Sequence, residues 1–562
     1  MKDLLINTYR RLCIIASYLA KGDLQGLYIR IKNHFNASTL ITTLSHPLIC
    51  PIVQTWGILT PPHTIFVAHI ISERLKHHGC LVEVFTTPPK VFNKNYYIVL
   101  CAQIFERLPP SERRIIYQLE QSVSSRWFTK QYLHDLNHSL TVVDYSIKNI
   151  EFLASKEIQF PHVYYLPIGA SKSYGLDAQE KTYDILFYGD CNSSIRRKQM
   201  LTELQKHFKV KICSEIFGHE MIAAIKKARF VINIHYYEGA LLELPRIQEC
   251  LSLGVPVVSE TARDQDEYPE LEHVVKYFEA GSVPDMITAV QHMLDNPPTA
   301  QLIQESVDKS SAKFAYMFDR FLIGMGFLPT SFATKLDAQI PENAEMIALS
   351  LPETIIRWRK FQSIRPKNCY VFSGFRRTPG WVGCGLSYRY LADMALKYKL
   401  PYLTVMEDDV VLYEDFEDKL HIVKEFLNIH KDEWDIFSGL IAVLDPKCKI
   451  LKIEKYKDIN FIYIDTMISA VFNIYNSNLL SVYQTWDPEN MDMHTNTIDR
   501  YIGEKPNLRV IVTLPFLVGH CEEMHSTLWG FKNTQYNDHI ASSAALLKQK
   551  VRDFELNQKI QH

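Results

Sequence analysis

From residue 48 to residue 328, short apolar runs alternate with stretches that have helical spacing. Runs such as YDILFYGD (183–190) have the length of a strand, and ELPRIQECLSLG (243–254) has the apolar period of a helix. Strands that alternate with helices favour parallel sheets covered by helices. The sequence therefore predicts an α/β fold with two Rossmann-like lobes, at 48–168 and 169–328.

A second α/β pattern follows an irregular stretch. Residues 329–365 have no clear period and contain three prolines, so we expect a linker there. The strand-like runs CYVFSG (369–374) and YLTVM (402–406) follow it, with a helical stretch between them. We therefore expect a further domain at 366–545 and a C-terminal helix or tail at 546–562.

The composition excludes several classes of protein. Hydrophobic residues make up 47% of the 562 residues and charged residues 22%, which excludes a disordered chain. The net charge of -2 has none of the basic excess of a nucleic-acid-binding protein. The 11 cysteines form no CxxC pair, so a zinc ribbon or a disulfide framework is not indicated and we expect a cytoplasmic protein.

The N-terminal segment 1–47 is basic and amphipathic. Its longest apolar run, Leu12–Ala20, is nine residues long and too short to span a bilayer. Residues 1–35 are typical of two helices broken at Gly22-Asp23. Two interpretations stay open, a helical cap on the first lobe and a peripheral contact with the inner membrane.

The stretch PYLTVMEDDVVL (401–412) contains three adjacent acidic residues directly after an apolar run. An apolar strand delivers Glu407, Asp408 and Asp409 at its carboxyl end, where open α/β sheets bind ligands. Three adjacent carboxylates repel one another unless a cation offsets them, and hard divalent cations take oxygen ligands from protein and phosphate. The alternative is a solvated acidic turn that caps the next helix.

The wider stretch GWVGCGLSYRYLADMALKYKLPYLTVMEDDVVL (380–412) resembles the signature of the family 25 glycosyltransferases, which build bacterial lipopolysaccharide and modify collagen. Tyr388 stands where that family carries a histidine. The resemblance implies a GT-A fold that uses Mn²⁺ or Mg²⁺ and a nucleotide sugar. Asp409, with Glu407 beside it, would hold the metal, and Asp408 would contact the metal or the nucleotide ribose.

Three later residues are candidates for the same site. Asp499 in MHTNTIDRYI (493–502) is a candidate general base for inverting transfer, with a helix salt bridge as the alternative. By resemblance to GT-A enzymes, in which a late histidine completes the metal shell, His520 and His525 are candidate metal ligands. A structural role is the alternative for each histidine.

The second lobe has a candidate diphosphate site. Gly189 follows a strand, and Arg196, Arg197 and Lys198 begin the next helix, where backbone N–H groups and basic side chains suit an anion. Basic residues on a solvated helix are the alternative.

A motif later in this lobe also carries a resemblance. The run from Glu249 to Val258 is similar to the Glu-Ala-x-x-x-Gly-x-Pro-Val-Val motif of GT-B glycosyltransferases. It implies that Glu249 binds the nucleotide ribose, and Arg246 is a candidate phosphate ligand. The motif's earlier Glu is unassigned, because Glu238 lies eleven residues before Glu249 and Glu243 lies six before it.

These observations favour a two-module glycosyltransferase. A metal-independent GT-B module and a metal-dependent, inverting GT-A module would add sugars from nucleotide-sugar donors to one growing glycan or glycolipid, a bacterial lipopolysaccharide or capsule. One alternative keeps only the GT-A module active, with the GT-B unit a degenerate glycan-binding or membrane-docking scaffold. Another is a non-catalytic glycan-binding or assembly protein.

Overall fold

A computed structural model describes the chain from residue 53 to residue 561, apart from 124–125, 175–178, 192, 339, 342–343, 523–525 and 529–534. The predicted segment 1–47 with its membrane-contact alternative, and His525, lie outside the described residues. Within the described part, no helix is long and apolar enough to cross a membrane.

The first lobe is a six-stranded sheet whose strands all run parallel. Its strands are buried on both faces at the centre, which explains their continuous apolar runs. In spatial order they are β2 (Leu81–Phe85), β1 (Thr55–Leu59), β3 (Tyr96–Leu100), β4 (Arg114–Gln118), β5 (Thr141–Asp144) and β6 (Val163–Tyr165). The helices are α3 (Ile65–His77), α4 (Lys130–Asn137) and α5 (Ile147–Ala154).

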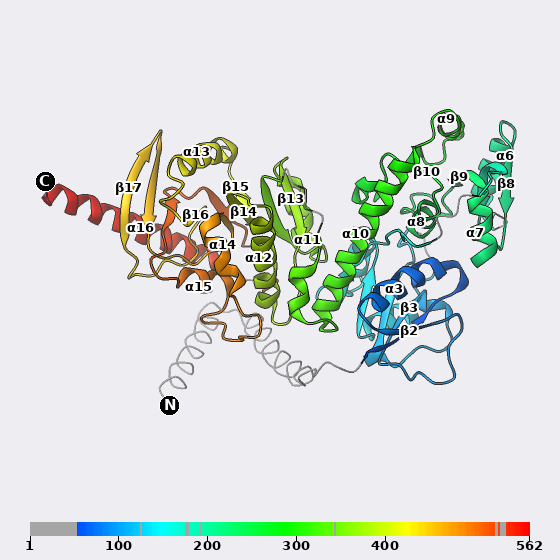
Figure 1. The fold of residues 1–562 in the computed structure, drawn as a ribbon, viewed down its shortest axis with the longest axis horizontal. Coiled ribbons are helices and arrows are strands. Elements are labelled where there is room, and N and C mark those ends of the chain that lie inside the picture. Colours follow the sequence, from blue (N-terminus) through cyan, green and yellow to red (C-terminus); the bar gives the residue numbers. More distant parts are fainter. Residues whose placement is uncertain are drawn as a thin grey trace.

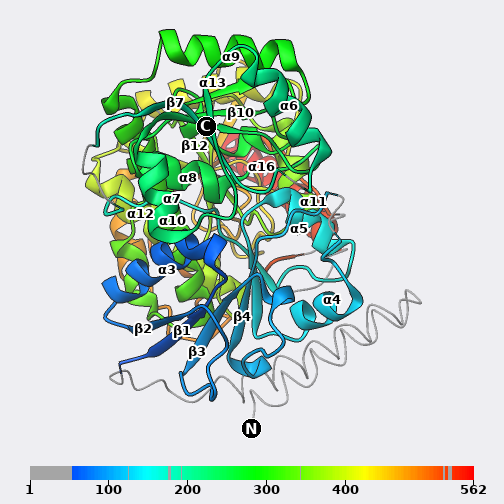
Figure 2. The same cartoon turned by 90° about the vertical axis from the view of Figure 1, so that its right-hand side faces the viewer.

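The second lobe is a five-stranded parallel sheet that lies beside the first lobe at one end of the molecule (Figure 1; Figure 2). Its strands, in spatial order, are β11 (Val275–Phe278), β10 (Val257–Glu260), β9 (Ala228–Asn233), β7 (Tyr183–Tyr188) and β8 (Val210–Cys213). Its helices are α6 (Ile195–Gln205), α7 (Gly218–Lys226), α8 (Leu244–Ser252) and α9 (Val283–Asp295). The predicted α/β class with two Rossmann-like parallel sheets is confirmed.

The C-terminal domain has a mixed sheet of eight strands. In spatial order they are β13 (Cys369–Ser373), β12 (Met346–Ser350), β14 (Tyr402–Glu407), β19 (Phe472–Asn476), β16 (Ile436–Ser438), β20 (Val510–Thr513), β18 (Ile459–Ile464) and β17 (Ile450–Tyr456). β15 (Val410–Leu412) and β21 (Val518–His520) form a separate antiparallel pair. The helices are α11 (Ile355–Ile364), α12 (Gly380–Lys397), α13 (Phe416–Ile429), α14 (Ser477–Gln484), α15 (Ile498–Gly503) and α16 (Tyr536–Gln561).

Two predicted boundaries differ from this arrangement. The segment 329–365 is not a linker, because its second half forms β12 and α11 of the C-terminal domain and β12 pairs with both β13 and β14. The chain from residue 546 to 561 is helical, as one alternative predicted, but this helix, α16, begins earlier, at Tyr536. Leu547 on that helix is fully buried, and Ser543 donates a hydrogen bond to the carbonyl of Ala442 at 3.2 Å.

The long helix α10 (Ala300–Met325) lies between the two lobes and the C-terminal domain (Figure 1). Its adjacent residues Asp319 and Arg320 have no exposed surface. Asp319 accepts hydrogen bonds from Arg74 of α3 at 2.8 Å and pairs with His78 at 2.7 Å. These contacts tie α10 to the first lobe.

Arg320 joins α10 to the C-terminal domain. Its guanidinium donates to both carboxylate oxygens of Glu353, at 2.7 and 3.0 Å, and to the carbonyl of Gly374 at 2.6 Å. Arg376 lies 3.6 Å from Glu353 and donates to the carbonyl of Val163 in the first lobe at 2.6 Å. A buried ion cluster therefore joins the first lobe, α10 and the C-terminal domain.

We predict that Glu353→Ala lowers the free energy of unfolding by about 3–5 kcal/mol, because it leaves two buried arginines without their carboxylate. Urea denaturation followed by tryptophan fluorescence measures the loss. The matched control is Glu345→Ala, which removes an exposed pair with Lys424 and costs about 1 kcal/mol or less. Equal losses in the two variants would contradict a structural role for the cluster.

Candidate functional site

A basic cluster lies at the carboxyl end of β7, around Gly189. The φ angle of Gly189 is +129°, which favours glycine. A Cβ atom at this position would lie 3.1 Å from Nη2 of Arg246 and 3.7 Å from Nη1 of Arg197. Two guanidinium groups thus flank this backbone. The strand order of the sheet reverses between β7 and β9, which is where open α/β sheets bind ligands.

Glu243 lies between the two arginines. Arg197 donates to its Oε1 at 2.8 Å, and Nη2 of Arg246 lies 3.1 Å from its Oε2. Burial raises the pKa of Glu243, but the two arginines outweigh burial and hold the pKa well below its usual range. The imidazole of His235, 1% exposed, faces the cluster with Nδ1 at 3.8 Å from Oε1 of Glu243. One carboxylate offsets one of two guanidinium charges, so the cluster can bind an anion.

The three basic residues at the start of α6 differ in their contacts. Arg196 forms a bidentate pair with the buried Glu260, with Nη1 at 2.7 Å from Oε2, and so serves the packing of the lobe. Lys198 is exposed on α6. Successive helix residues point about 100° apart, so among these three basic residues only Arg197 reaches Gly189. The sequence indicated the basic run but not which of its residues lies beside Gly189.

Glu249 lies one helical turn after Arg246 on α8 and is 4% exposed. Burial raises the pKa of its carboxyl to about 7. Its Oε1 atom accepts a hydrogen bond from the Tyr174 hydroxyl at 3.0 Å. Glu238 is exposed and Glu243 pairs with Arg197, and the earlier glutamate of the GT-B motif stays unassigned.

A second cluster lies where β12 and β14 end. These neighbouring parallel strands mark the reversal of strand order in the C-terminal sheet. Asp408 is 4% exposed, and its Oδ2 accepts from the Ser350 hydroxyl at 2.6 Å. Its Oδ1 accepts from Nε of Arg357 at 2.8 Å. Both carboxylate oxygens are thus engaged within the protein, and Asp408 holds Arg357 in place.

Asp409 shares that arginine. Its Oδ2 lies 3.0 Å from Nη2 of Arg357 and 3.4 Å from Nε2 of His520, which β21 positions opposite Val410. Burial opposes ionisation, but Arg357 and His520 outweigh it and lower the pKa of Asp409. Its Oδ1 atom is buried and has no hydrogen-bond partner among the described residues. One carboxylate oxygen of Asp409 is therefore left without a partner in the described part of the chain, and we refer to it as the open oxygen.

The structure brings the predicted acids of this domain together. Burial and the negative charge of Asp409 raise the pKa of Glu407, and Asp499 at the start of α15 adds to that shift. The same carboxylates raise the pKa of the buried Cys384 thiol, for which burial is the larger cause. The ring of Tyr536 lies 4.4 Å from that of His520. Sequence reasoning missed Arg357, because a single arginine on a helix carries no motif.

The metal expected from the resemblance fits this site only in part. Among the described residues, no three His, Cys, Asp or Glu side chains are arranged to hold a metal ion. The predicted set of Glu407, Asp409 and His520 is therefore not a preformed cage, since Arg357 and His520 take one oxygen of Asp409. The open Oδ1 atom is the ligand that remains, with further oxygens to come from a bound phosphate.

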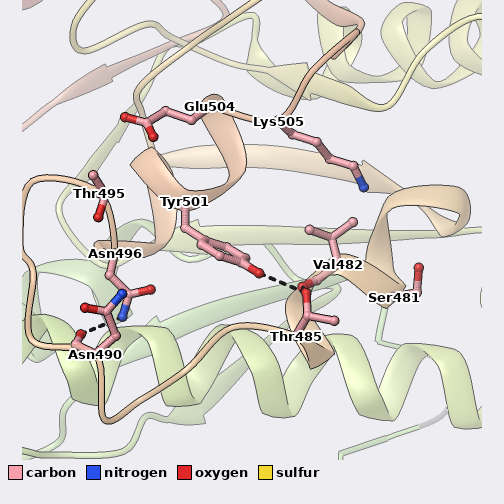
Figure 3. Close-up of a pocket in the computed structure, with 9 residues that line it drawn as sticks. All are labelled: Ser481, Val482, Thr485, Asn490, Thr495, Asn496, Tyr501, Glu504 and Lys505. Atoms are coloured by element: carbon pink, nitrogen blue, oxygen red, sulfur yellow. Dashed lines mark hydrogen bonds between the residues drawn. The ribbon is translucent and has the colours of Figure 1, made fainter.

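A polar pocket of about 630 Å³ lies between α14, α15 and the loop that joins them (Figure 3). Tyr501 points across it, with its hydroxyl 2.8 Å from Oγ1 of Thr485. The pocket shares no residue with the acidic cluster. It is lined by Ser481, Val482, Thr485, Asn490, Thr495, Asn496, Tyr501, Glu504 and Lys505.

Comparison with known proteins gives distant similarities. No family model matches the chain. An uncharacterized protein of Acanthamoeba polyphaga mimivirus is 28% identical over 159 residues, which are 26% of this chain and 20% of that protein. The chain thus matches about a fifth of the length of this curated relative.

Several solved structures are similar to about half of the chain. AviGT4, a glycosyltransferase involved in avilamycin A biosynthesis, has 9% identity and a TM-score of 0.36, covering 49% of this chain and 99% of that one. Sucrose-phosphate synthase from Thermosynechococcus elongatus has 14% identity and a TM-score of 0.35, covering 50% and 99%. HepE from Anabaena, in complex with UDP and glucose, has 13% identity and a TM-score of 0.34, covering 49% and 100%. At these values the function has to be inferred from the site itself.

We predict that Glu407→Gln is more stable than the native chain at pH 8, and that this gain in stability is much smaller at pH 5. A carboxyl with a raised pKa binds more protons in the folded state, so stability falls as the pH rises above 4.5, the usual pKa of a glutamate. Glutamine removes that loss. We expect a gain on the order of 2 kcal/mol at pH 8 in urea denaturation, and little gain at pH 5.

Glu414→Gln, at an exposed position, is the matched control. Its free energy of unfolding should differ from that of the native chain by the same amount at both pH values. A Glu407→Gln variant that gained no stability between pH 5 and pH 8 would contradict the raised pKa.

Proposed function

We propose that the chain is a glycosyltransferase with two nucleotide-sugar sites, a GT-B module formed by the two lobes and a GT-A module formed by the C-terminal domain. One observation carries this proposal. Each site has charged side chains at the carboxyl ends of the strands where its sheet reverses order, near Gly189 in one sheet and at Asp408-Asp409 in the other. The two clusters have opposite charge and share no residue.

In the GT-B module, the donor diphosphate binds between Arg197 and Arg246 and lies against the backbone of Gly189. A glycine suits this close approach because a side chain there would meet both guanidinium groups. Glu249, one turn along α8, accepts the ribose hydroxyls. We expect no metal in this module, because the arginines, less the one charge that Glu243 offsets, place positive charge directly beside the diphosphate.

In the GT-A module, Asp409 would hold Mn²⁺ or Mg²⁺ through its open Oδ1 atom. When bound, the ion would neutralise charge on the diphosphate leaving group. Arg357 adds a fixed positive charge at the same place, held by Asp408. Asp499 accepts the proton of the acceptor hydroxyl, as inverting transfer requires. His520 orients Asp409 rather than completing a cage.

The acceptor of the GT-A module is a glycan, and the polar pocket in Figure 3 is its binding surface. Hydroxyl and amide side chains both donate and accept hydrogen bonds, as sugar hydroxyls do. The pocket is lined in part by Tyr501 of α15, the short helix that also carries the proposed base Asp499. The resemblance of residues 380–412 favours a glycan of the lipopolysaccharide or capsule type, extended by consecutive additions.

We predict that the two transfers can be abolished separately. Arg246→Ala removes a diphosphate ligand of the GT-B site, and Asp409→Ala removes the metal ligand of the GT-A site. Each variant should lower one transfer roughly 100-fold and leave the other unchanged. A panel of nucleotide sugars, assayed with Mn²⁺ and with EDTA, measures both, and only the transfer lost in Asp409→Ala should need the metal.

Matched controls are Arg229→Ala on the surface of the second lobe and Asp458→Asn on the C-terminal domain, both exposed. A single substitution that abolished both transfers would contradict the presence of two sites. If Asp409→Ala abolished one metal-dependent transfer and no transfer were sensitive to Arg246→Ala, only the C-terminal domain would be active. The two lobes would then be a scaffold.

We also predict that Tyr501→Ala raises the KM for the acceptor about tenfold and leaves kcat and the KM for the donor unchanged, because the ring lines the pocket and not the acidic cluster. Steady-state kinetics separate these constants. Tyr398→Ala, at an exposed position after α12, is the control. A fall in kcat with an unchanged acceptor KM would contradict the assignment of the pocket.

A further inference from the structure

The segment that leaves the first lobe after β6 is attached to that lobe before it reaches the second one. The Ser171 hydroxyl donates to Oε2 of Glu73 on α3 at 2.9 Å, and the Ser173 hydroxyl donates to Oε1 of the same residue. The ring of Tyr174 packs edge-on against Phe66 and His69 of α3, with centroids 5.0 Å apart in each pair. Tyr174 is thus held by the first lobe.

Its hydroxyl contacts the second lobe. It donates to Oε1 of Glu249 at 3.0 Å, across the junction between the lobes. A carboxylate oxygen accepts more than one hydrogen bond, and Oε2 of Glu249 has no partner among the described residues. The bond therefore fixes the orientation of the carboxylate and leaves its other oxygen for a ligand.

We propose that Tyr174 is a positioning residue for the nucleotide site of the second lobe: it orients Glu249 toward the ribose hydroxyls and makes ribose binding depend on the first lobe. This inference rests on the proposed function, since it requires a nucleoside diphosphate at the cluster of Arg197 and Arg246. It adds a residue that no motif indicated and a physical link between the lobes.

The charge state of Glu249 gives the proposal a second readout. The titratable groups that act on Glu249 are Tyr174, Arg246, Tyr188 and Cys250. Burial raises the pKa of Glu249 to about 7, and the Tyr174 hydrogen bond and Arg246 oppose that rise. An ionised carboxylate is the better acceptor for ribose hydroxyls, so affinity falls as the pH drops through 7. Removing the Tyr174 hydroxyl moves this midpoint to higher pH.

The test is calorimetric titration of the full chain with UDP, GDP and ADP between pH 5.5 and pH 8.5. The binding event that Arg246→Ala removes identifies the second-lobe site. Tyr174→Phe keeps the packed ring and removes only the hydroxyl, and we expect about tenfold weaker binding in that event, with the pH midpoint raised. The matched control is Tyr277→Phe on β11 of the same lobe, which leaves both quantities unchanged.

A further variant separates the ligand's own titration from that of Glu249. Glutamine cannot ionise, so binding by Glu249→Gln, although weaker, should keep only the pH dependence of the phosphate itself, and adding Tyr174→Phe to it should leave the pH profile unchanged. Unchanged affinity and midpoint in Tyr174→Phe would overturn the inference and leave the proposed function intact. Absence of any binding event sensitive to Arg246→Ala would overturn the nucleotide site of the lobes, and the inference with it.

Discussion

Two fully buried charges at adjacent positions of α10 hold the molecule together. Asp319 faces the first lobe and pairs with Arg74 and His78, and Arg320 faces the C-terminal domain and pairs with Glu353. A buried charge without its partner costs several kcal/mol, so both contacts have to persist in the folded chain. The first lobe, α10 and the C-terminal domain also share one continuous hydrophobic core.

In the proposed function, the two sites would meet the same chemical requirement in opposite ways. A diphosphate needs positive charge around it, and the second lobe supplies that charge directly through Arg197 and Arg246. The C-terminal domain presents carboxylates at the corresponding place in its sheet, where Arg357 contacts both Asp408 and Asp409. The open oxygen of Asp409 accounts for the remaining need, because a divalent cation bound there would reverse the local charge. A basic site and an acidic site thus suit one class of ligand, with and without a metal.

Much of this architecture follows from local patterns in the sequence. The alternation of strands and helices predicts both parallel sheets, and the acidic strand end predicts where Asp408 and Asp409 lie. The linker prediction fails at β12, because five residues among prolines have no visible period and β12 becomes a strand only by pairing with β13 and β14.

Residue roles were harder to predict than elements. The choice of Arg197 over Arg196 depends on the rotation of α6 against β7, which a basic run does not encode. Arg357 and Tyr174 come from segments far in sequence from the carboxylates they contact, 51 and 75 residues away. Contacts of this kind arise only from tertiary packing, so the motifs indicated the carboxylates but not the partners that orient them.

The proposed function requires two separate nucleotide sites on one chain. Native mass spectrometry of the full chain, titrated with a mixture of UDP, GDP and ADP in the presence of Mg²⁺, measures their number most directly. Two separate sites would bind two nucleoside diphosphates per chain at saturation. A limit of one bound nucleotide at all concentrations would contradict this requirement.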